Sequence, residues 1–521
     1  MDSLSDGFFL DALGLEGEAS DTSELQSALE ALNQQSSSFP ADSPRSEHVF
    51  DLSFYSKDAS DEDAGHVPCA GAAGSDAFDL NFPDDLEDPK SVLSGFSLVS
   101  DSFHQDDVGA TGLHGTHACP KFEPGENTTE SRFRFFDRLL CQAVDIWGEE
   151  PVRSVCGQKF LVQSLFTGVG AGECMFERLQ QAAARRWGSG HMSIAFGSAC
   201  DFDKRCQSFL RQAFPERCIF GDIREIASQS GTASAYCHQH WTKCHVHPQQ
   251  HSNSTGQVRV WIVTGPCVAH SRMGRRLQFQ DDRASCHWTA RDMIMAEEPD
   301  WVLLENVPEF DMTSYLRTME SKYTFKGCVV KPQHSGDPMG RERYMGCGVL
   351  TKRWQWETSQ TETLESLLAY LSTSAVGDCD SFFDTSLQCP APLSASMQRS
   401  KERYESIFQG TQRGLLYDLS QNAAKRPRTN RVTGALPTIL TRSLFYSTNH
   451  ETVMNGLDSL LAMGLPVTPA AARASGTHRW LSAVQGHAWP ESVLRHFSGN
   501  GLHVASFGRV LFVAILFTKR I

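Results

Sequence analysis

Residues 164–172, with the sequence SLFTGVGAG, decide the fold of this chain. An apolar run of strand length precedes them and a helical pattern follows, so they predict a strand that turns into a helix. Glycines at such a turn allow a tight bend, let the backbone approach a ligand closely and expose a helix N-terminus. Glycine-rich turns of this kind also bind dinucleotides, so the stretch alone does not identify the ligand.

Strand and helix patterns alternate on both sides of this turn. Apolar runs of strand length lie at 160–166, 192–196, 218–221, 259–263, 301–304, 325–330 and 344–350. Helical patterns lie at about 173–187, 204–214 and 285–297. This alternation predicts an α/β fold with a parallel or mostly parallel sheet.

Three carboxylates follow the second and third predicted strands. Asp201 and Asp203 come after the run at 192–196, and Asp222 ends the run at 218–221. A carboxylate at the second strand end is placed to hold ribose hydroxyls. One at the third strand end can accept a hydrogen bond from an adenine amino group. Each acid alone could equally be a cap or turn residue, but the ordered set predicts a site for a nucleoside cofactor.

Charge is distributed unevenly along the 521 residues. Residues 1–130 hold 27 Asp and Glu but only four Lys and Arg, a net charge of −23, whereas the remainder carries +8. So much charge with little contiguous apolar sequence predicts a disordered acidic arm. The arm repeats FDLSF at 50–54 and FDLNF at 78–82, a pattern typical of docking segments for protein partners, although an undirected solvated tail would also carry it.

The remaining composition excludes several classes of protein. The acidic start is unlike a secretory signal, and the apolar run at 510–517 is far shorter than the ~20 residues of a membrane span. Sixteen cysteines without an export signal predict reduced thiols in a cytosolic or nuclear protein. A mildly basic body is compatible with a nucleic-acid backbone as partner, whereas the acidic arm would repel it.

Reactive side chains occupy three further strand ends. Cys267 follows the strand at 259–263, Glu305 follows the next strand, and Arg341 and Arg343 precede the last one. Such strand ends meet at one edge of an α/β sheet, so we expect these side chains to converge there.

At these residues the chain resembles the C5-cytosine methyltransferase family. The motif order matches, from F-x-G-x-G through the acid after strand two, Asp-Ile, Pro-Cys, Glu-Asn-Val and R-x-R to Pro-Thr at 437–438 and Gly-Asn at 499–500. The resemblance covers about 155–350 and 433–517. It implies a Rossmann-like methyltransferase sheet, S-adenosylmethionine as cofactor and DNA, or alternatively RNA, as partner.

The resemblance also implies a role for each residue of the site. Cys267 would add as a thiolate to C6 of cytosine and so activate C5. Glu305 would hold and protonate N3, which requires a raised pKa, while Arg341 and Arg343 would bind O2 and the flanking phosphates. The target base would be flipped out of its duplex. The residues implied to bind the cofactor are Phe166, Gly168, Gly170, Asp201, Phe202, Asp222, Ile223, Pro266 and Asn500.

The chain departs from the family pattern around the nucleophile. The family usually has Pro-Pro-Cys-Gln where this chain has GPCV at 265–268, Gln where it has Met339, and Phe where it has His270. These changes touch the loop that closes on the flipped base, so they concern rate and substrate preference more than the reaction type. A buried, purely structural Cys267 is the alternative interpretation.

These observations leave four functions open. The sequence favours a DNA cytosine-5 methyltransferase. The alternatives are an RNA (tRNA-type) cytosine methyltransferase, a catalytically silent nucleic-acid-binding protein of the same fold, and an unrelated dinucleotide-dependent enzyme. We expect four regions, namely the arm at 1–130, a catalytic part at 131–350, a target-recognition insert at 351–432 and a C-terminal catalytic part at 433–521.

Two polar clusters lie outside these motifs. Seven Cys and His residues between 237 and 251 could bind zinc, but none of their spacings is a standard one, so we expect a His-rich surface loop and no metal site. The run KRPR at 425–428 is a nuclear import signal, a DNA-backbone contact or a basic loop. We expect a nuclear protein, with the cytoplasm as the alternative.

Overall fold

The computed structural model describes residues 129–228, 234–246, 256–267, 269–270, 278–359, 361–373, 378–385, 392–408, 413–424, 430–431 and 434–521. The chain divides into two units, Met1–Gly115 and Thr116–Ile521, and every described residue belongs to the second. The predicted acidic arm up to residue 128 and the basic run at 425–428 lie outside the described residues.

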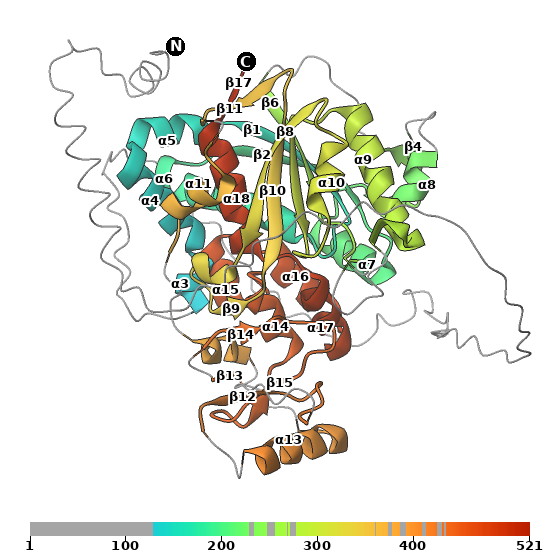
Figure 1. The fold of residues 1–521 in the computed structure, drawn as a ribbon, viewed down its shortest axis with the longest axis vertical. Coiled ribbons are helices and arrows are strands. Elements are labelled where there is room, and N and C mark those ends of the chain that lie inside the picture. The colour runs from blue at the N-terminus through green and yellow to red at the C-terminus, as the bar shows by residue number, and fades with distance from the viewer. Residues whose placement is uncertain are drawn as a thin grey trace, which may run out of the picture. The chain divides into compact units, whose positions relative to one another are not determined.

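Within the described residues, a mixed sheet of nine strands forms the centre of the second unit (Figure 1). The strands are β1 (Lys159–Leu165), β2 (Ser193–Cys200), β3 (Ile219–Phe220), β4 (Ser234–Cys237), β5 (Thr242–His245), β6 (Gln257–Val263), β7 (Trp301–Asn306), β8 (Tyr323–Val330) and β10 (Arg343–Leu350). Their order is β5-β4-β3-β2-β1-β6-β7-β10-β8. The five strands from β3 to β7 in this order are parallel, and the outer ones pair antiparallel.

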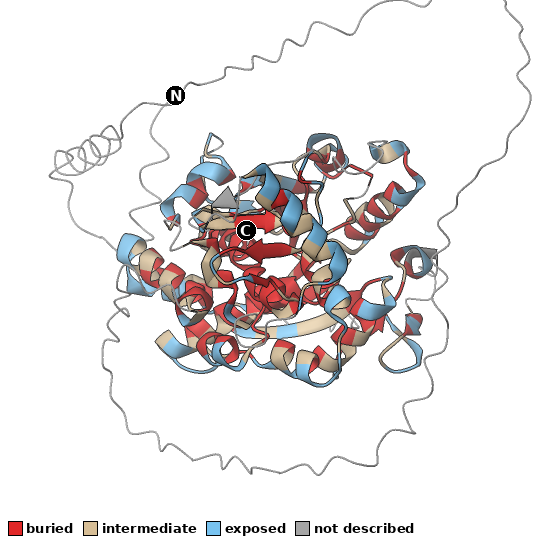
Figure 2. Ribbon diagram, turned by 90° about the horizontal axis from the view of Figure 1, so that it is seen from below, coloured by how far each residue is buried: buried red, intermediate tan, exposed pale blue. Residues whose placement is uncertain are grey.

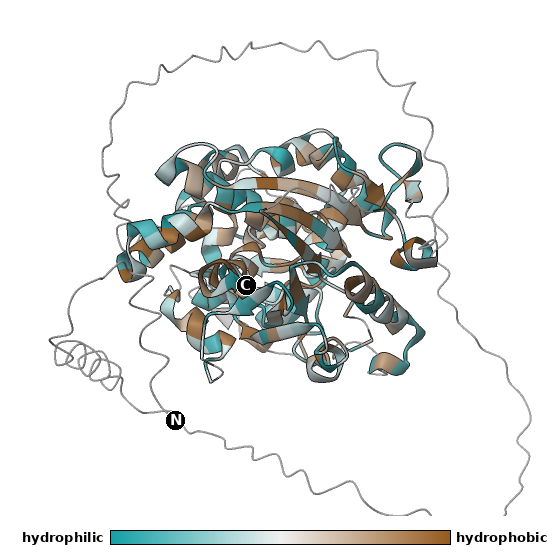
Figure 3. Ribbon diagram, turned by 90° about the horizontal axis from the view of Figure 1, so that it is seen from above, coloured by the Kyte–Doolittle hydropathy of each residue, from teal (hydrophilic) through white to brown (hydrophobic). Residues whose placement is uncertain are grey.

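Neighbouring residues of the central strands point into two different hydrophobic clusters. On β7, Trp301 and Leu303 belong to one cluster. Val302 and Leu304 belong to the other. A strand that is buried on both faces has a nearly continuous apolar sequence, which is what the runs in this chain show. Figure 2 shows the buried residues through the middle of the unit, and Figure 3 shows the hydrophobic strands.

Helices cover both faces of this sheet (Figure 1). The first cluster takes in α4 (Phe135–Trp147), α5 (Glu149–Cys156), α6 (Ala171–Trp187), α7 (Lys204–Ala213), α11 (Leu364–Tyr370) and α18 (Val504–Phe517). The second takes in α8 (Ile223–Ser228), α9 (Ser285–Glu297) and α10 (Met312–Arg317). The unit is therefore a three-layer α/β fold, which confirms the predicted fold class.

Two parts of the sequence prediction need correction. Helices α4 and α5 precede β1, where no element was expected. The described part of the expected His-rich surface loop is a β-hairpin, in which β4 and β5 pair over four residue pairs and extend the sheet beyond β3. Only β4 alternates, with Ala235 and Cys237 buried, whereas β5 is largely exposed. Two strands of four residues give too short a pattern to be recognised in the sequence.

A smaller sheet lies in the region of the predicted insert. Its order is β13-β12-β15-β16, and its strands are β12 (Leu415–Asp418), β13 (Asn430–Arg431), β15 (Phe445–Ser447) and β16 (Thr452–Val453). Stacked rings of Tyr404, from α13 (Ala395–Ile407), and Tyr417 fill its core at a centroid distance of 4.8 Å.

The boundaries predicted for the insert do not coincide with this small sheet. Strands β15 and β16 lie beyond residue 432, whereas β11 (Trp354–Trp356) pairs with β17 (Thr518–Arg520). The first residues of the predicted insert therefore belong to the larger fold, and its role in target recognition stays a prediction.

The C-terminal residues return to the large unit. They form α14 (Gly456–Ala462), α15 (Pro469–Ser475), α16 (Arg479–Gln485) and α17 (Glu491–Asn500) before α18. In the described part of the chain, one segment, Glu491–Phe517, is apolar and long enough to cross a membrane. Because 78% of its most apolar part is buried inside the protein, it is weak evidence for a membrane span. Short elements complete the fold: α3 (Thr129–Phe133), β9 (Met339–Gly340) and β14 (Leu436–Pro437).

Candidate active site

The glycine-rich turn after β1 has a left-handed backbone at three positions. Phe166 has φ 60°, Gly168 has φ 59° and Gly170, the residue before α6, has φ 78°. Glycine adopts such angles without strain, but a phenylalanine does not. The hydroxyl of Thr264 donates to the Phe166 carbonyl at 2.9 Å and helps to hold the strained residue. Backbone strain of this kind concentrates at functional sites.

The glycines of this turn serve two different purposes. A Cβ at Gly168 would meet nothing within 4 Å, so the turn leaves open space where a ligand can approach. A Cβ at Gly172 would lie 2.8 Å from Cδ1 of Ile262 on β6. Gly172 therefore permits close packing of α6 on the sheet, while Gly168 keeps the ligand side free.

A buried ion pair lies beneath the turn. Glu173 of α6 and Arg217 are both fully buried, and the guanidinium of Arg217 donates to the carboxylate at 2.5 Å. Ser164, at the end of β1, donates to the same carboxylate oxygen, also at 2.5 Å. The pair therefore joins the strand, the helix and the segment before β3 under the predicted cofactor site.

Breaking this pair should destabilise the protein strongly. In an Arg217→Met variant the Glu173 charge stays buried without its partner, and we expect a loss of about 3–5 kcal/mol in the free energy of unfolding. Urea denaturation measures the loss. The double variant Glu173→Gln with Arg217→Met removes both charges and should recover most of it. A single-variant loss below about 1 kcal/mol, the range of an ordinary surface substitution, would contradict a central role for the pair.

Asp201 ties the glycine turn to the end of β2. Its two carboxylate oxygens accept the backbone N–H of Gly168 at 2.7 Å and of Asp203 at 2.9 Å. Burial raises the pKa of Asp201 to about 6, although these two hydrogen bonds oppose the shift. Asp201 thus positions the turn, and its predicted contact with a ribose stays a prediction.

Asn500 lies beside the end of β2, although it is about 300 positions away in the sequence. Its side-chain amide is 3.1 Å from Nε2 of His496, and this nitrogen lies 3.2 Å from the carboxylate of Asp203. Burial alone would raise the pKa of Asp203, but the hydrogen bonds from His496 and Arg205 hold it well below its usual value. The fold thus joins two predicted parts of the cofactor site.

Phe202 lies between β2 and α7, and its side chain is unusually exposed. Its side chain is 71% exposed, although a ring of this size is normally buried. Single exposed apolar residues are common, but here the ring lies between Asp201 and Asp203 at the carboxyl end of a central strand. An exposed aromatic face at this place is suited to stacking on a flat base.

The end of β3 supplies one partly exposed and one buried residue. Asp222 forms an ion pair with Arg224 at 2.5 Å, and this hydrogen bond lowers the pKa of Asp222. Ile223 is 2% exposed and packs in the second cluster, so it can shape the cofactor site only through packing.

Cys267 is half-buried in the loop that follows β6. The loop turns at this residue, since the N–H of His270 donates to the Cys267 carbonyl at 2.9 Å. Nε2 of His287 lies 3.0 Å from the carbonyl of Pro266, and a Cβ at Gly265 would come within 2.4 Å of the same ring. This contact explains why glycine stands where the family usually has its first proline.

Glu305 and Arg343 form a largely buried ion pair next to Cys267. Nε of Arg343 lies 3.2 Å from the Glu305 carboxylate, and the two side chains are 13% and 11% exposed. They meet because β7 and β10 pair antiparallel, with Met345 opposite Glu305. Burial raises the pKa of Glu305, and Arg343 and Arg341 counteract part of this effect.

The thiol of Cys267 is under the influence of the same groups. Burial raises its pKa, the Glu305 carboxylate raises it further, and the guanidinium groups of Arg343 and Arg341 lower it. Asn306 adds a direct link, since its side-chain amide donates to the Gly265 carbonyl at 3.2 Å. The sulfur and the carboxyl group thus lie at the same edge of the sheet.

Arg341 has a different environment from the one expected. It is 3% exposed, and its guanidinium donates to the carbonyls of Ile439, Gly499 and Gly501 at 2.9, 3.2 and 2.6 Å. Burial lowers its pKa to about 9. The structure therefore favours a positioning role for Arg341 over the predicted contact with the base and phosphates.

The late motifs of the sequence support this part of the site. The hydroxyl of Thr438 donates to the Gly340 carbonyl at 2.7 Å, and β14 pairs with β9 beside it. A Cβ at Gly499 would come within 2.2 Å of the backbone nitrogen of Thr441. The Pro-Thr and Gly-Asn motifs thus hold the backbone around Arg341 in place.

Sequence reasoning missed several residues that shape this site. Thr264, His287 and His496 act through contacts with residues far away in the chain, and no local pattern reveals such contacts. His496 lies four residues before Asn500, on the same face of α17, which is the one signal that could have identified it. Val268 and residues 271–277 of the nucleophile loop lie outside the described residues.

Part of this chain matches a known protein family. Residues 160–379 match the family model described as C-5 cytosine-specific DNA methylase. This range contains the glycine turn, the nucleophile loop, Glu305, Arg341 and Arg343. No match was found among curated protein sequences.

Solved structures similar to this chain include two methyltransferases. The Dnmt2 methyltransferase of S. pombe is 10% identical, with a TM-score of 0.42, and the match covers 68% of this chain and 97% of that one. The methyltransferase EhMeth of Entamoeba histolytica is 12% identical, with a TM-score of 0.39, over 68% and 98%. At this level of similarity they say nothing about the substrate. The family match, which covers residues 160–379, is the finding that relates this chain to the C-5 cytosine-specific DNA methylases.

Proposed function

We propose that this protein transfers a methyl group from S-adenosylmethionine to carbon 5 of cytosine in DNA. The observation that carries the proposal is the group of Cys267, Glu305 and Arg343 at one sheet edge, within the residues that match the family. Nucleophile, acid and cation are the three kinds of group that addition to a pyrimidine ring requires.

The residues around the glycine turn fit S-adenosylmethionine. Open space lies over Gly168, an exposed aromatic ring is available on Phe202, and the carboxylate of Asp222 and the amide of Asn500 are accessible. The space over Gly168 suits a ligand that lies close to the backbone, and the ring of Phe202 suits stacking on adenine. Asp222 can accept a hydrogen bond from an amino group, and Asn500 can bond to another polar group of the ligand. When bound, S-adenosylmethionine supplies an electrophilic methyl group on its sulfonium sulfur.

In the proposed reaction Cys267 forms a bond from its thiolate sulfur to C6 of the cytosine. The electron pair of the C5–C6 double bond then becomes available at C5, while the carboxyl group of Glu305 gives a proton to N3. C5 would then accept the methyl group that bound S-adenosylmethionine supplies, with the neutral thioether as the leaving group. Loss of the C5 proton to solvent, departure of the Cys267 sulfur from C6 as a thiolate and return of the N3 proton to the Glu305 carboxylate restore the aromatic ring and both side chains.

The buried charges around the site suit these steps. A thiolate is the reactive form of Cys267, and Arg343 favours it by lowering the thiol pKa. A protonated carboxyl group is the reactive form of Glu305, and burial favours it by raising the carboxyl pKa. Arg343 is placed to hold both groups and to meet negative charge that develops on the base.

Two variants are predicted to shift the pKa of Cys267 in opposite directions. Removing the negative charge in Glu305→Gln should lower the thiol pKa, and removing the positive charge in Arg343→Gln should raise it. The rate of Cys267 alkylation by iodoacetamide follows the thiolate and reports this pKa. The midpoint should move to lower pH in the first variant and to higher pH in the second. Shifts of the same sign would contradict the proposed geometry.

DNA is proposed over RNA because the family match is to a DNA methylase. The test offers radiolabelled S-adenosylmethionine with unmethylated duplex DNA and, separately, with a tRNA transcript. We expect label in 5-methylcytosine of the DNA. Label in the RNA alone would favour the RNA methyltransferase, and label in neither would favour the silent binding protein.

A further inference from the structure

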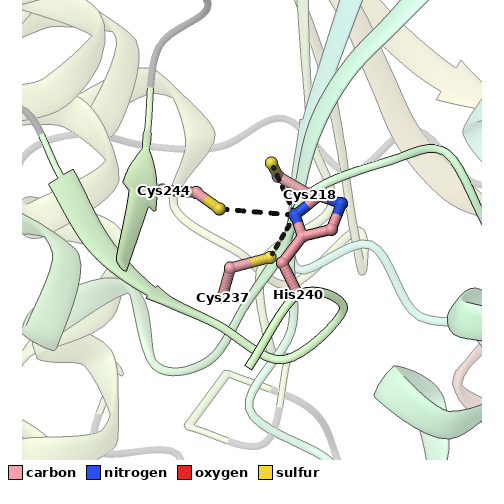
Figure 4. Close-up of side chains that lie close together, drawn as sticks. All are labelled: Cys218, Cys237, His240 and Cys244. Carbon is pink, nitrogen blue, oxygen red and sulfur yellow. Dashed lines mark hydrogen bonds between the residues drawn. The ribbon is translucent and has the colours of Figure 1, made fainter. Parts of the chain in front are cut away.

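Three cysteines and one histidine converge at the edge of the sheet beside β3. Cys218 precedes β3, Cys237 ends β4, His240 lies in the turn of the hairpin and Cys244 lies on β5. Their sulfur and nitrogen atoms all lie within 4.8 Å of one another. Figure 4 shows the three sulfur atoms around a single ring nitrogen of His240. The three cysteines are free thiols.

The distances in this cluster follow an unusual pattern for hydrogen bonds. Nδ1 of His240 lies 3.3 Å from the sulfur of Cys244, 3.5 Å from that of Cys237 and 3.6 Å from that of Cys218. A ring nitrogen carries either one proton or one lone pair, so it can make one good hydrogen bond in its plane. Three sulfurs at nearly equal distances from it are not explained by hydrogen bonding.

The same distances are those of the edges of a metal-centred tetrahedron. With zinc bonds of about 2.3 Å to sulfur and about 2.0–2.1 Å to nitrogen, a tetrahedral site separates nitrogen from each sulfur by about 3.5 Å. The observed values of 3.3 to 3.6 Å surround this figure. Thiolate and imidazole are also the ligands that zinc prefers.

We propose that Cys218, Cys237, His240 and Cys244 bind one zinc ion. Four protein ligands complete a tetrahedron and leave no position for water or substrate, so the site is structural. The backbone N–H of Ile219 donates to the sulfur of Cys237 at 3.4 Å, as expected for a thiolate that needs further stabilisation. The site is separate from the residues proposed for methyl transfer.

The position of the ligands indicates what the metal does. In the described residues, the hairpin of β4 and β5 joins the rest of the sheet through one residue pair between strands, Phe220 with Cys237. A zinc ion held by Cys218 and by three hairpin residues would cross-link the hairpin to β3. The ion would thereby fix the sheet edge next to Gly221 and Asp222. A metal that joins segments in this way contributes directly to folding stability.

Sequence spacing alone could not reveal this site. Three ligands follow a C-x2-H-x3-C pattern from Cys237 to Cys244, but the fourth, Cys218, lies 19 positions earlier in the chain. Only the pairing of β3 with β4 brings it to the others. The structure corrects the expected surface loop to a hairpin. The proposal of a zinc ion departs from the expectation that this segment binds no metal.

The test begins with the metal content of the full-length protein, purified without added metal or chelator. Mass spectrometry of the metals should find about one zinc per chain, the stoichiometry of one closed site. Cys237→Ser and His240→Ala should each lose most of this zinc. The matched controls are Cys328→Ser, at a half-buried cysteine of β8, and His245→Ala, at an exposed histidine of β5, and both should keep it.

A second measurement does not depend on the folding of any variant. Replacing zinc by Co²⁺ in the unmodified chain should give the intense visible absorption of tetrahedral cobalt with thiolate ligands. Chelation should lower the melting temperature and open the hairpin at 234–246 to proteolysis, and zinc should reverse both effects. Protein without bound metal, or zinc retained in full by both ligand variants, would overturn the proposal.

Discussion

In a Cys267→Ser variant the rate of methyl transfer is expected to fall by about 10⁴-fold or more. A serine hydroxyl is a far weaker nucleophile than a thiolate, so the covalent intermediate would no longer form at a useful rate. Its affinity for DNA and for S-adenosylmethionine should change little, since the side chains differ by one atom. The half-buried thiol lies beside Glu305 and Arg343, where it can reach a base held by them.

The measurement compares initial rates of tritium transfer to DNA with binding of the same DNA duplex. Cys328→Ser is the matched control, because Cys328 is also half-buried but lies on the outer strand β8. It should keep the rate of the unmodified protein. If Cys267→Ser methylates DNA as fast as this control, the thiol has a structural role and the covalent mechanism is wrong.

A Glu305→Gln variant should show the second-largest effect, a loss of about 10²–10⁴-fold in the rate at saturating substrate. Glutamine keeps the size and a hydrogen-bonding edge but cannot give a proton to N3. Burial raises the pKa of Glu305, so the unmodified protein holds the proton more readily than an ordinary glutamate does.

Glu342→Gln provides the control for this loss. Glu342 lies between Arg341 and Arg343 in the sequence, but its side chain is 50% exposed and pairs with Lys331 at 3.0 Å. The variant should retain almost full activity. A Glu305→Gln rate within a few-fold of this control would show that the carboxyl group only anchors Arg343.

The fold could be predicted because burial on both sheet faces leaves a continuous signal in the sequence. Apolar runs such as the one ending at Leu304 reflect two hydrophobic clusters at once. Parallel strands then bring their carboxyl ends to one edge, so the order of motifs predicted which residues meet. Cys267, Glu305 and Arg343 do meet there, although their roles in chemistry stay proposals.

Contacts between distant segments explain what could not be predicted. The sequence predicts the same role for Arg341 and Arg343. In the structure Arg341 instead donates to the carbonyls of Gly499 and Gly501, about 160 positions later. Similarly, Arg217 and Glu173 form the ion pair under the glycine turn only because α6 packs against the segment before β3. A sequence shows that a charge is present, but it does not show which group neutralises the charge.

The hairpin beside β3 illustrates a second limit. Its strands have four residues each, and only β4 alternates buried and exposed positions, whereas β5 is largely exposed. A short segment with so many polar residues usually forms a surface loop, and this composition is why the sequence predicts a loop here. The proposed zinc ion would add stability to this short hairpin.

The central claim concerns a covalent bond between the sulfur of Cys267 and C6 of a cytosine. The most direct test incubates the protein with S-adenosylmethionine and a DNA duplex that carries 5-fluorocytosine, whose fluorine cannot leave as the C5 proton does. We predict an adduct that survives denaturation, with the modified nucleotide mapped by peptide mass spectrometry to Cys267. An adduct on a different residue, or methylation of normal DNA without any adduct on the fluorinated duplex, would contradict the account.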